Sequence, residues 1–239
     1  MQPQFFVIGG VVLFIASIAR PDVAKHAHFN TTRFVRPGYP HLRFARRQLA
    51  YLVKTKSLGL TYQRSASFSS VGAFHPGDGN VDGRLHGIGD SDFGIPRCVS
   101  GALVMVAGAA VVWRVLAQGT PAISPGEAEF YALTTTVSET VTVRQFFEEL
   151  GFVFPSGTPS ATQVFCDSRT ASTLAEHGAT SSRTRFIHRR LNFCRFYHDD
   201  GVIYVASIRG NKNPANGLTK FTFGDMFRRE RAYMLGLPA

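Results

Sequence analysis

The sequence contains few cysteines. Only three of the 239 residues are Cys, and Cys98, Cys166 and Cys194 are widely spaced and odd in number. Such a set gives neither a disulfide framework nor the paired spacing of a zinc site. We therefore expect a chain that works in a reducing compartment, inside the cell in the cytoplasm or nucleus, and that is not secreted.

The sequence also has no hydrophobic run long enough to cross a bilayer. The apolar stretch from Phe5 to Ala19 is shorter than the roughly 20 residues that a spanning helix needs. No basic segment precedes it, and Arg20 and Pro21 follow it where a signal peptide would have small residues. We expect a buried helix here and no membrane partner.

Acidic residues are scarce compared with basic ones. There are 16 Asp and Glu against 26 Lys and Arg, which gives a formal net charge of +10 and a pI near 10.0. An excess of this size favours a polyanionic partner, nucleic acid above all, although arginine-rich surfaces are often simply solvated. Between residues 20 and 56 the basic residues face one acid, Asp22, and a second basic group follows at helical spacing: Arg183, Arg185, Arg189, Arg190 and Arg195.

The pattern of apolar residues predicts an α/β chain with a small helical segment in front. Helices are expected at 5–19 and 41–55, interrupted by Pro21, Pro37 and Pro40. A stretch rich in Ser, Gly, His and Pro at 63–80 indicates a linker with a domain boundary near residue 80. Beyond it the expected elements are strands at 84–91, 99–106 and 109–117, a helix at 127–150, a strand at 164–166, helices at 169–176 and 184–199, a strand at 202–208, and helices at 214–218 and 222–235. This order predicts a mixed sheet of five strands flanked by helices, whose first three strands form an antiparallel meander.

Acidic residues stand at the edges of three of these elements. Asp90 lies in G-D-S-D-F-G, Glu129 in S-P-G-E-A-E-F-Y-A-L, and Asp167 in V-F-C-D-S. Three acids from separate elements can converge, and carboxylate oxygens are the ligands that Mg²⁺ prefers. Two divalent ions roughly 3.5–4 Å apart could then support phosphoryl transfer.

Each of these positions has an alternative. Asp92 competes with Asp90, and the Asp-Ser-Asp could instead form a turn or the D-x-D of a metal-dependent sugar transferase. Glu127 and Glu129 lie about 200° apart on a helix, so only one of them can face the site. Asp167 with the following serine could instead cap the next helix.

Taken in order, the blocks resemble the ribonuclease H domain of copia-type retrotransposon polyproteins. They are G-D-S-D-F-G, V-S-G-A-L-V-M-V-A-G-A-A-V-V-W, S-P-G-E-A-E-F-Y-A-L, V-F-C-D-S, S-S-R-T-R-F-I-H-R-R and N-G-L-T-K, and the part before residue 62 resembles the end of the reverse transcriptase of the same polyproteins. The resemblance implies a helical remnant of the reverse transcriptase thumb or connection at 1–62, a linker at 63–80 and a ribonuclease H-like domain at 81–239. It also implies hydrolysis of the RNA strand of RNA–DNA hybrids with two Mg²⁺ or Mn²⁺ ions. Asp90, Glu129 and Asp167 would hold the ions, and the polymerase carboxylate motif is absent.

The chain departs from the family at the fourth acidic position. The family has an Asp two residues before Leu-Thr-Lys, whereas this chain has Asn216, an amide without charge that would be a weak fourth catalytic ligand. The alternative is therefore a catalytically inactive, nucleic-acid-binding remnant. In either case the expected partners are the hybrid and the rest of the polyprotein, and the expected nucleic-acid contacts are Arg183, Arg185, Arg189, Arg190 and Lys220.

Overall fold

Three helices open the chain. The computed structural model describes residues 2–63, 85–94, 96–152, 161–177 and 187–238. Within the first of these ranges lie α1 (Gln2–Ile18), a 3-10 turn η1 (Pro21–Val23), α2 (Ala24–Thr31) and α3 (Tyr39–Lys54). The predicted helices at 5–19 and 41–55 correspond to α1 and α3, whereas α2 was not predicted.

Prolines begin these helices more often than they interrupt them. Pro40 stands in the first turn of α3 and Pro21 in the first turn of η1. A first-turn proline loses no hydrogen bond, because the N–H groups there have no partner within the helix. Pro21 does follow the end of α1 at Ile18, as predicted, whereas Pro40 lies inside α3, and the helical segment that holds α2 was missed.

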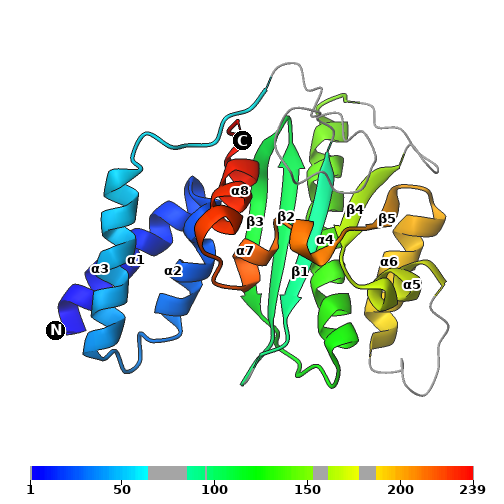
Figure 1. Cartoon of the computed structure of the whole chain (residues 1–239). Coiled ribbons are helices and arrows are strands. Elements are labelled where there is room, and N and C mark those ends of the chain that lie inside the picture. The colour runs from blue at the N-terminus through cyan, green and yellow to red at the C-terminus, as the bar shows by residue number, and fades with distance from the viewer. Residues whose placement is uncertain (1, 64–84, 95, 153–160, 178–186, 239) are drawn as a thin grey trace.

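The centre of the molecule is a five-stranded sheet (Figure 1). Its strands are β1 (His86–Asp92), β2 (Val99–Val106), β3 (Ala109–Ala117), β4 (Thr162–Cys166) and β5 (Ile203–Ser207), in the spatial order β3-β2-β1-β4-β5. The first three strands pair antiparallel, while β4 pairs parallel with both β1 and β5. This mixed sheet confirms the predicted fold class, and its order and strand directions are those of the ribonuclease H-like fold.

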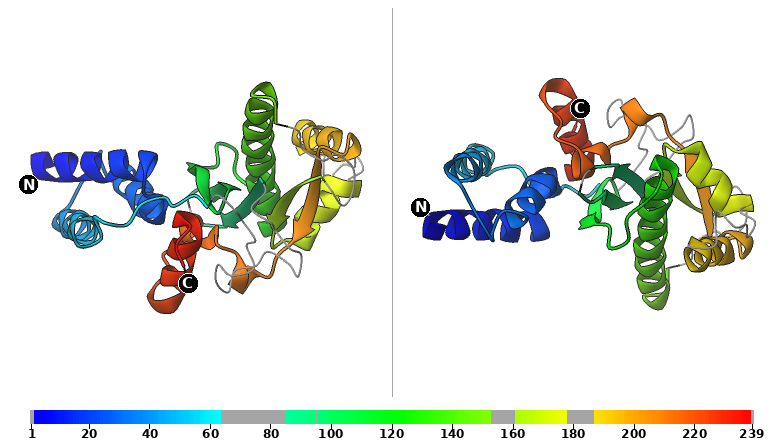
Figure 2. Two further views of the ribbon diagram at one scale, coloured as in Figure 1. Left: turned by 90° about the horizontal axis from the view of Figure 1, so that it is seen from above. Right: turned by 90° about the horizontal axis from the view of Figure 1, so that it is seen from below.

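Helices cover both faces of the sheet. The long helix α4 (Pro125–Glu149) lies on one face with α5 (Arg169–His177) and α6 (His188–Asp199), and α7 (Asn216–Thr219) and α8 (Gly224–Leu235) lie on the other (Figure 2). Each face has its own apolar core. The core on the α4 side includes Phe130, Leu133, Leu191 and Ile203. The core on the side of α7 and α8 includes Ile88, Leu103, Leu218 and Met234.

Glycines in β1 and β2 let helices approach the sheet closely. A Cβ atom at Gly87 would lie 2.2 Å from Thr140 Oγ1 of α4, and one at Gly101 would lie 2.9 Å from Leu218 Cβ of α7. Both distances are too short for real atoms. The two glycines therefore bring α4 and α7 close to the middle of the sheet, beside the strand that carries Asp90.

The N-terminal helices share the core of the second face. Ala24 of α2 belongs to the apolar cluster of Ile88 and Met234, with Leu60 packed against it. The indole N–H of Trp113 in β3 donates to the carbonyl of Ala16 at 2.6 Å. The boundary expected near residue 80 and most of the linker expected at 63–80 lie outside the described residues, so this division stays a prediction.

Helix α1 is the apolar segment for which membrane crossing was weighed. Across the described ranges, no helix combines the length and apolarity that a bilayer crossing requires.

Candidate metal centre

The register of two parallel strands places Asp90 beside Asp167. The ladder between β1 and β4 ends with Ile88 opposite Phe165. Asp90 and Asp167 each stand two residues beyond this last pair. Because side chains alternate with a period of two, both acids continue the face of the residues that end the ladder, at the point where the strands separate.

The third acid, Glu129, stands just after the first turn of α4. Ser124 caps the helix by accepting a hydrogen bond from the N–H of Glu127 at 3.2 Å. The carboxylate of Glu127 accepts from the N–H of Ile123 at 2.9 Å and from the hydroxyl of Tyr131 at 2.5 Å, so this acid stabilises the helix start. The carboxylate of Glu129 instead lies close to the acids at the ends of β1 and β4.

Asp90, Glu129 and Asp167 form one cluster. One carboxylate oxygen of each lies within 4.8 Å of those of the other two. Neither Asp92 nor Glu127 belongs to the group. Ser168 accepts from the N–H of Ala171 at 3.2 Å, so the serine begins α5 and leaves the side chain of Asp167 to the cluster.

Burial and mutual repulsion raise the pKa values of these acids. The carboxyl of Asp90 is fully buried, and burial raises its pKa to about 6, with a further contribution from Asp167. Burial and then the charges of Asp90 and Asp167 raise the pKa of Glu129 to about 8. The pKa of Asp167 is also raised, mainly by burial. Without a counter-charge the cluster therefore resists full ionisation.

The donor set fits a hard divalent cation. All three groups offer carboxylate oxygens, which suit Mg²⁺ and Mn²⁺ better than soft metals. The Oε2 atom of Glu129 is buried and has no hydrogen-bond partner among the described residues. An unpartnered buried acceptor is costly, and a cation bound there would relieve that cost. Metal binding by these residues stays a prediction.

The segment around α7 holds Asp90 from the other side. Thr219 donates its hydroxyl to Asp90 Oδ2, and Lys220 Nζ lies 3.2 Å from Asp90 Oδ1. Asn213 fixes this segment to β1, because its amide donates to the carbonyl of Gly89 at 2.9 Å. Sequence reasoning missed Asn213 and Thr219. The Asn-Pro dipeptide was the available signal, because Asn213 Oδ1 accepts from the N–H of Ala215 at 2.9 Å in a turn typical of Asn.

Asn216 is buried, and its amide is already occupied. Its Nδ2 donates to the carbonyls of Gly210 and Asn213 at 2.7 and 2.8 Å, and its Oδ1 accepts from Lys220 Nζ at 2.9 Å. The side-chain oxygen of Asn216, which the sequence offered as a fourth ligand, is therefore directed to Lys220. Its role as a weak metal ligand stays a prediction.

Of the arginines expected to bind nucleic acid, the two that the structure describes are not part of the cluster. Arg183 and Arg185 lie outside the described residues. Arg189 and Arg190 are exposed on α6, and the guanidinium of Arg190 lies 4.2 Å from the ring centre of Tyr131, on the α6 side of α4. Lys220 is the only one of the described candidates that touches a carboxylate of the cluster.

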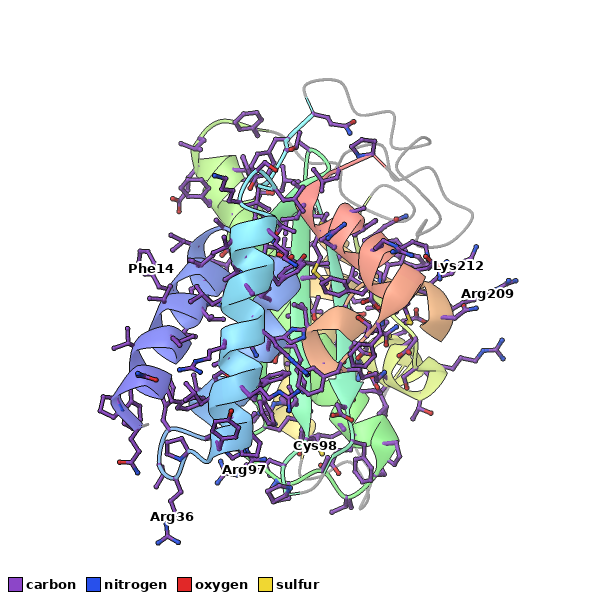
Figure 3. The ribbon with its side chains drawn as sticks, turned by 60° about the vertical axis from the view of Figure 1, so that its left-hand side comes forward. Phe14, Arg36, Arg97, Cys98, Arg209 and Lys212 are labelled. Atoms are coloured by element: carbon purple, nitrogen blue, oxygen red, sulfur yellow. The ribbon has the colours of Figure 1, made fainter. Side chains whose placement is uncertain are left out.

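Two basic residues that were not predicted lie in the turn after β5, next to a glycine that passes close to the cluster. Gly210 passes so close to Asp167 that a Cβ atom there would lie 3.1 Å from Asp167 Oδ2. Its neighbours Arg209 and Lys212 are exposed and project outward from this side of the molecule (Figure 3). Nothing in their sequence spacing indicated this position, which depends on the turn after β5.

The fold and the acidic cluster define an α/β protein of the ribonuclease H-like class with a candidate divalent-metal site. No family model matches the sequence. The chain is 30% identical over 212 residues, 88% of its length, to the "Retrovirus-related Pol polyprotein from transposon TNT 1-94" of Nicotiana tabacum, and it spans 15% of that relative. It is 32% identical over 134 residues to the "Putative transposon Ty5-1 protein YCL074W" of Saccharomyces cerevisiae, covering 55% of this chain and 40% of the relative.

Two further similarities complete the comparison. The "Secreted RxLR effector protein 161" of Plasmopara viticola is 30% identical over 134 residues, which cover 55% of this chain and 85% of that protein. The crystal structure of RNase H1 from Halobacterium salinarum superposes with a TM-score of 0.39 at 15% identity, covering 55% of this chain and 89% of that one. The two transposon relatives support a similarity to a part of retrotransposon Pol polyproteins, the family that the blocks in the sequence resemble.

Proposed function

We propose that this chain is a copia-type ribonuclease H that hydrolyses the RNA strand of RNA–DNA hybrids in the presence of Mg²⁺ or Mn²⁺. The observation that carries the proposal is the meeting of Asp90, Glu129 and Asp167, each from a separate element, within 4.8 Å of one another. The similarity to Pol polyproteins supports the choice of substrate, because a reverse-transcribing element makes such hybrids. An intracellular location follows from the same context.

The residues of the cluster have distinct tasks in this proposal. Asp90, Glu129 and Asp167 would hold the divalent ion, and Thr219 fixes the rotamer of Asp90 through its hydroxyl. A bound ion supplies a water of lowered pKa and charge stabilisation for the leaving oxygen. In the hydrolysis, the oxygen of water bonds to phosphorus while one phosphorus–oxygen bond of the RNA backbone breaks.

Exposed basic side chains in the turn after β5 and on α6 suit a nucleic-acid backbone. Arg209 and Lys212 stand beside Gly210, which passes close to Asp167, and Arg189 and Arg190 lie exposed on α6. Contacts to phosphates fix the position of a duplex without reading its sequence. Recognition of a hybrid would therefore depend on backbone shape and on the 2′-hydroxyl groups of the RNA.

A second candidate function has support from Asn216. The fourth position carries an amide in place of an acid, and the amide oxygen accepts from Lys220, so among the described residues three acids form the cluster. This favours a folded, basic remnant that binds nucleic acid without cleaving it. The two candidates share the fold and the partner and differ only in turnover.

Cleavage of a labelled hybrid separates the two candidates. We expect the full chain to shorten the RNA strand in Mg²⁺ or Mn²⁺ and to leave it intact in EDTA, and we expect Asp167→Asn to abolish cleavage. Double-stranded DNA of the same sequence is the matched substrate control. Binding of the hybrid without cleavage by the wild-type chain would select the remnant.

A further inference from the structure

Lys220 occupies the side of the carboxylate cluster where a fourth acid is missing. Its ammonium nitrogen lies 3.2 Å from Asp90 Oδ1 and 2.9 Å from Asn216 Oδ1. Asp90 is fully buried, whereas the side chain of Lys220 is 46% exposed. The ammonium group thus reaches the buried acid from the open side of the site.

The position of this ammonium group is determined from two directions. The amide nitrogen of Asn216 is committed to two backbone carbonyls, so its oxygen must face Lys220. The backbone of the segment is in turn fixed to β1 by the hydrogen bond from Asn213 to Gly89. The ammonium group of Lys220 is therefore held between two fixed acceptors, Asp90 Oδ1 and Asn216 Oδ1.

Both oxygens of Asp90 already have partners in this arrangement. Thr219 donates to Oδ2 and Lys220 to Oδ1. A carboxylate that bridges two cations offers one oxygen to each of them. In this chain a cation at Oδ1 would have to displace the ammonium group, whereas Glu129 and Asp167 carry no such contact with Lys220 at hydrogen-bond distance among the described residues.

We propose that the ammonium group of Lys220 takes the place of one of the two expected cations, so that this cluster holds a single divalent ion. The inference rests on the proposed metal-dependent function and narrows the sequence-based expectation of two ions. The charges agree with it. Three ionised carboxylates and one ammonium group leave two negative charges, which one divalent ion neutralises.

Counting bound ions by calorimetric titration tests the inference without requiring turnover. We expect the wild-type chain of 239 residues to bind one Mn²⁺. Lys220→Met keeps most of the side-chain volume and removes the charge, so we expect it to bind two. Lys220→Gln provides a second neutral variant if the first one fails to fold, and Lys220→Arg, which keeps the charge, should still bind one ion. Lys56→Met, which changes an exposed lysine just after α3, is the matched control and should also bind one.

The outcomes distinguish this inference from the function on which it rests. Two ions on the wild-type chain, or a single ion on both neutral variants, would overturn the role of Lys220 and leave metal-dependent hydrolysis in place. No bound ion on any variant would overturn both. One ion on the wild type and two on the neutral variants, with Asp167→Asn weakening binding in each background, would support both.

Discussion

Two groups of buried charges in this molecule are built in opposite ways. Near the N-terminus, Arg20 and Asp22 are both buried and form a two-pronged pair, with Arg20 Nε and Nη2 each 2.8 Å from a different oxygen of Asp22. Tyr51 donates to the same carboxylate at 2.6 Å, and Arg20 also donates to the backbone carbonyl of Thr55 at 3.0 Å. Each charge there meets its opposite.

The carboxylate cluster instead gathers like charges. Asp90, Glu129 and Asp167 have one contact at hydrogen-bond distance with an ammonium group among the described residues, that of Lys220 with Asp90. The paired site joins α3 to the start of η1 and stabilises the arrangement of the helices. Ionising all three buried carboxylates is unfavourable because they repel one another, and a bound cation would offset that repulsion. The comparison indicates that unmatched charge, rather than burial alone, distinguishes the candidate site.

The largest expected effect comes from breaking the paired site. Asp22→Asn removes the charge that compensates Arg20 and leaves a buried guanidinium with only neutral acceptors. We expect the free energy of unfolding to fall by about 3–5 kcal/mol, measured by urea denaturation. Asp200→Asn, on an exposed acid at the end of α6, is the control and should change it by less than about 0.5 kcal/mol. A loss below 1 kcal/mol in Asp22→Asn would show that water or a rearranged partner replaces the carboxylate.

Metal addition should stabilise the protein through the carboxylate cluster. At a free ion concentration 100 times the Kd, a ligand that binds only the folded state adds about 2.7 kcal/mol to the free energy of unfolding. We expect Mn²⁺ to raise the Tm of the wild-type chain and to have little effect on Asp167→Asn. An equal rise in both proteins would mean that the ion binds elsewhere.

The pH dependence of stability should reveal the raised pKa values of the buried carboxyl groups. In the folded state the pKa of Glu129 is raised from 4.5 to about 8, that of Glu230 from 4.5 to about 7 and that of Asp90 from 3.8 to about 6, each mainly by burial. The folded protein therefore binds more protons than the unfolded chain between about pH 4 and pH 8, so its stability falls as the pH rises through this window.

The dependence of Tm on pH should be measured on chelator-treated protein, so that no bound ion neutralises the carboxylates. We expect its Tm to decrease from pH 5 to pH 8, and Glu129→Gln to flatten the decrease because the substituted side chain does not titrate. Saturating Mn²⁺ should flatten it as well. A Tm that rises steadily over the same range in the chelated wild type would contradict the raised pKa values.

The smallest effect is expected at a surface ion pair that belongs to neither site. Arg114 Nε lies 2.9 Å from Glu139 Oε1, but the side chain of Arg114 is 53% exposed. Arg114→Gln should lower the free energy of unfolding by about 0.2–1 kcal/mol, and 1 M NaCl should remove the difference. A larger loss would indicate that the arginine also packs through its aliphatic stem.

The sequence predicted the sheet well, because strands and the turns between them are indicated by local sequence patterns. The runs at 99–106 and 109–117 agree with β2 and β3 to the residue. The choices of Asp90 and Glu129 agree with the membership of the cluster, since a capping serine assigns Glu127 to the helix start. Helix α2 was missed, because its alternation of polar and apolar residues is weak and a proline precedes it.

The hydrogen-bond partners of Asn216 could not be predicted from the sequence. Whether the oxygen of Asn216 faces the ions or Lys220 depends on backbone carbonyls at Gly210 and Asn213, which fix the amide from the opposite side. Those contacts depend on the turn after β5 and on its attachment to Gly89. Residue spacing carries no information about contacts of this kind.

The packing of the first helices against β3 limits how the chain can be shortened. A version beginning after residue 63 would lose Ala24 and Leu60, and it would also lose the backbone hydrogen bonds from Thr61 to Leu235 and from Gln63 to Ala107. Trp113 and the outer surface of β3 would then face water. Such a truncated protein would need polar replacements on β3 to stay monodisperse during purification.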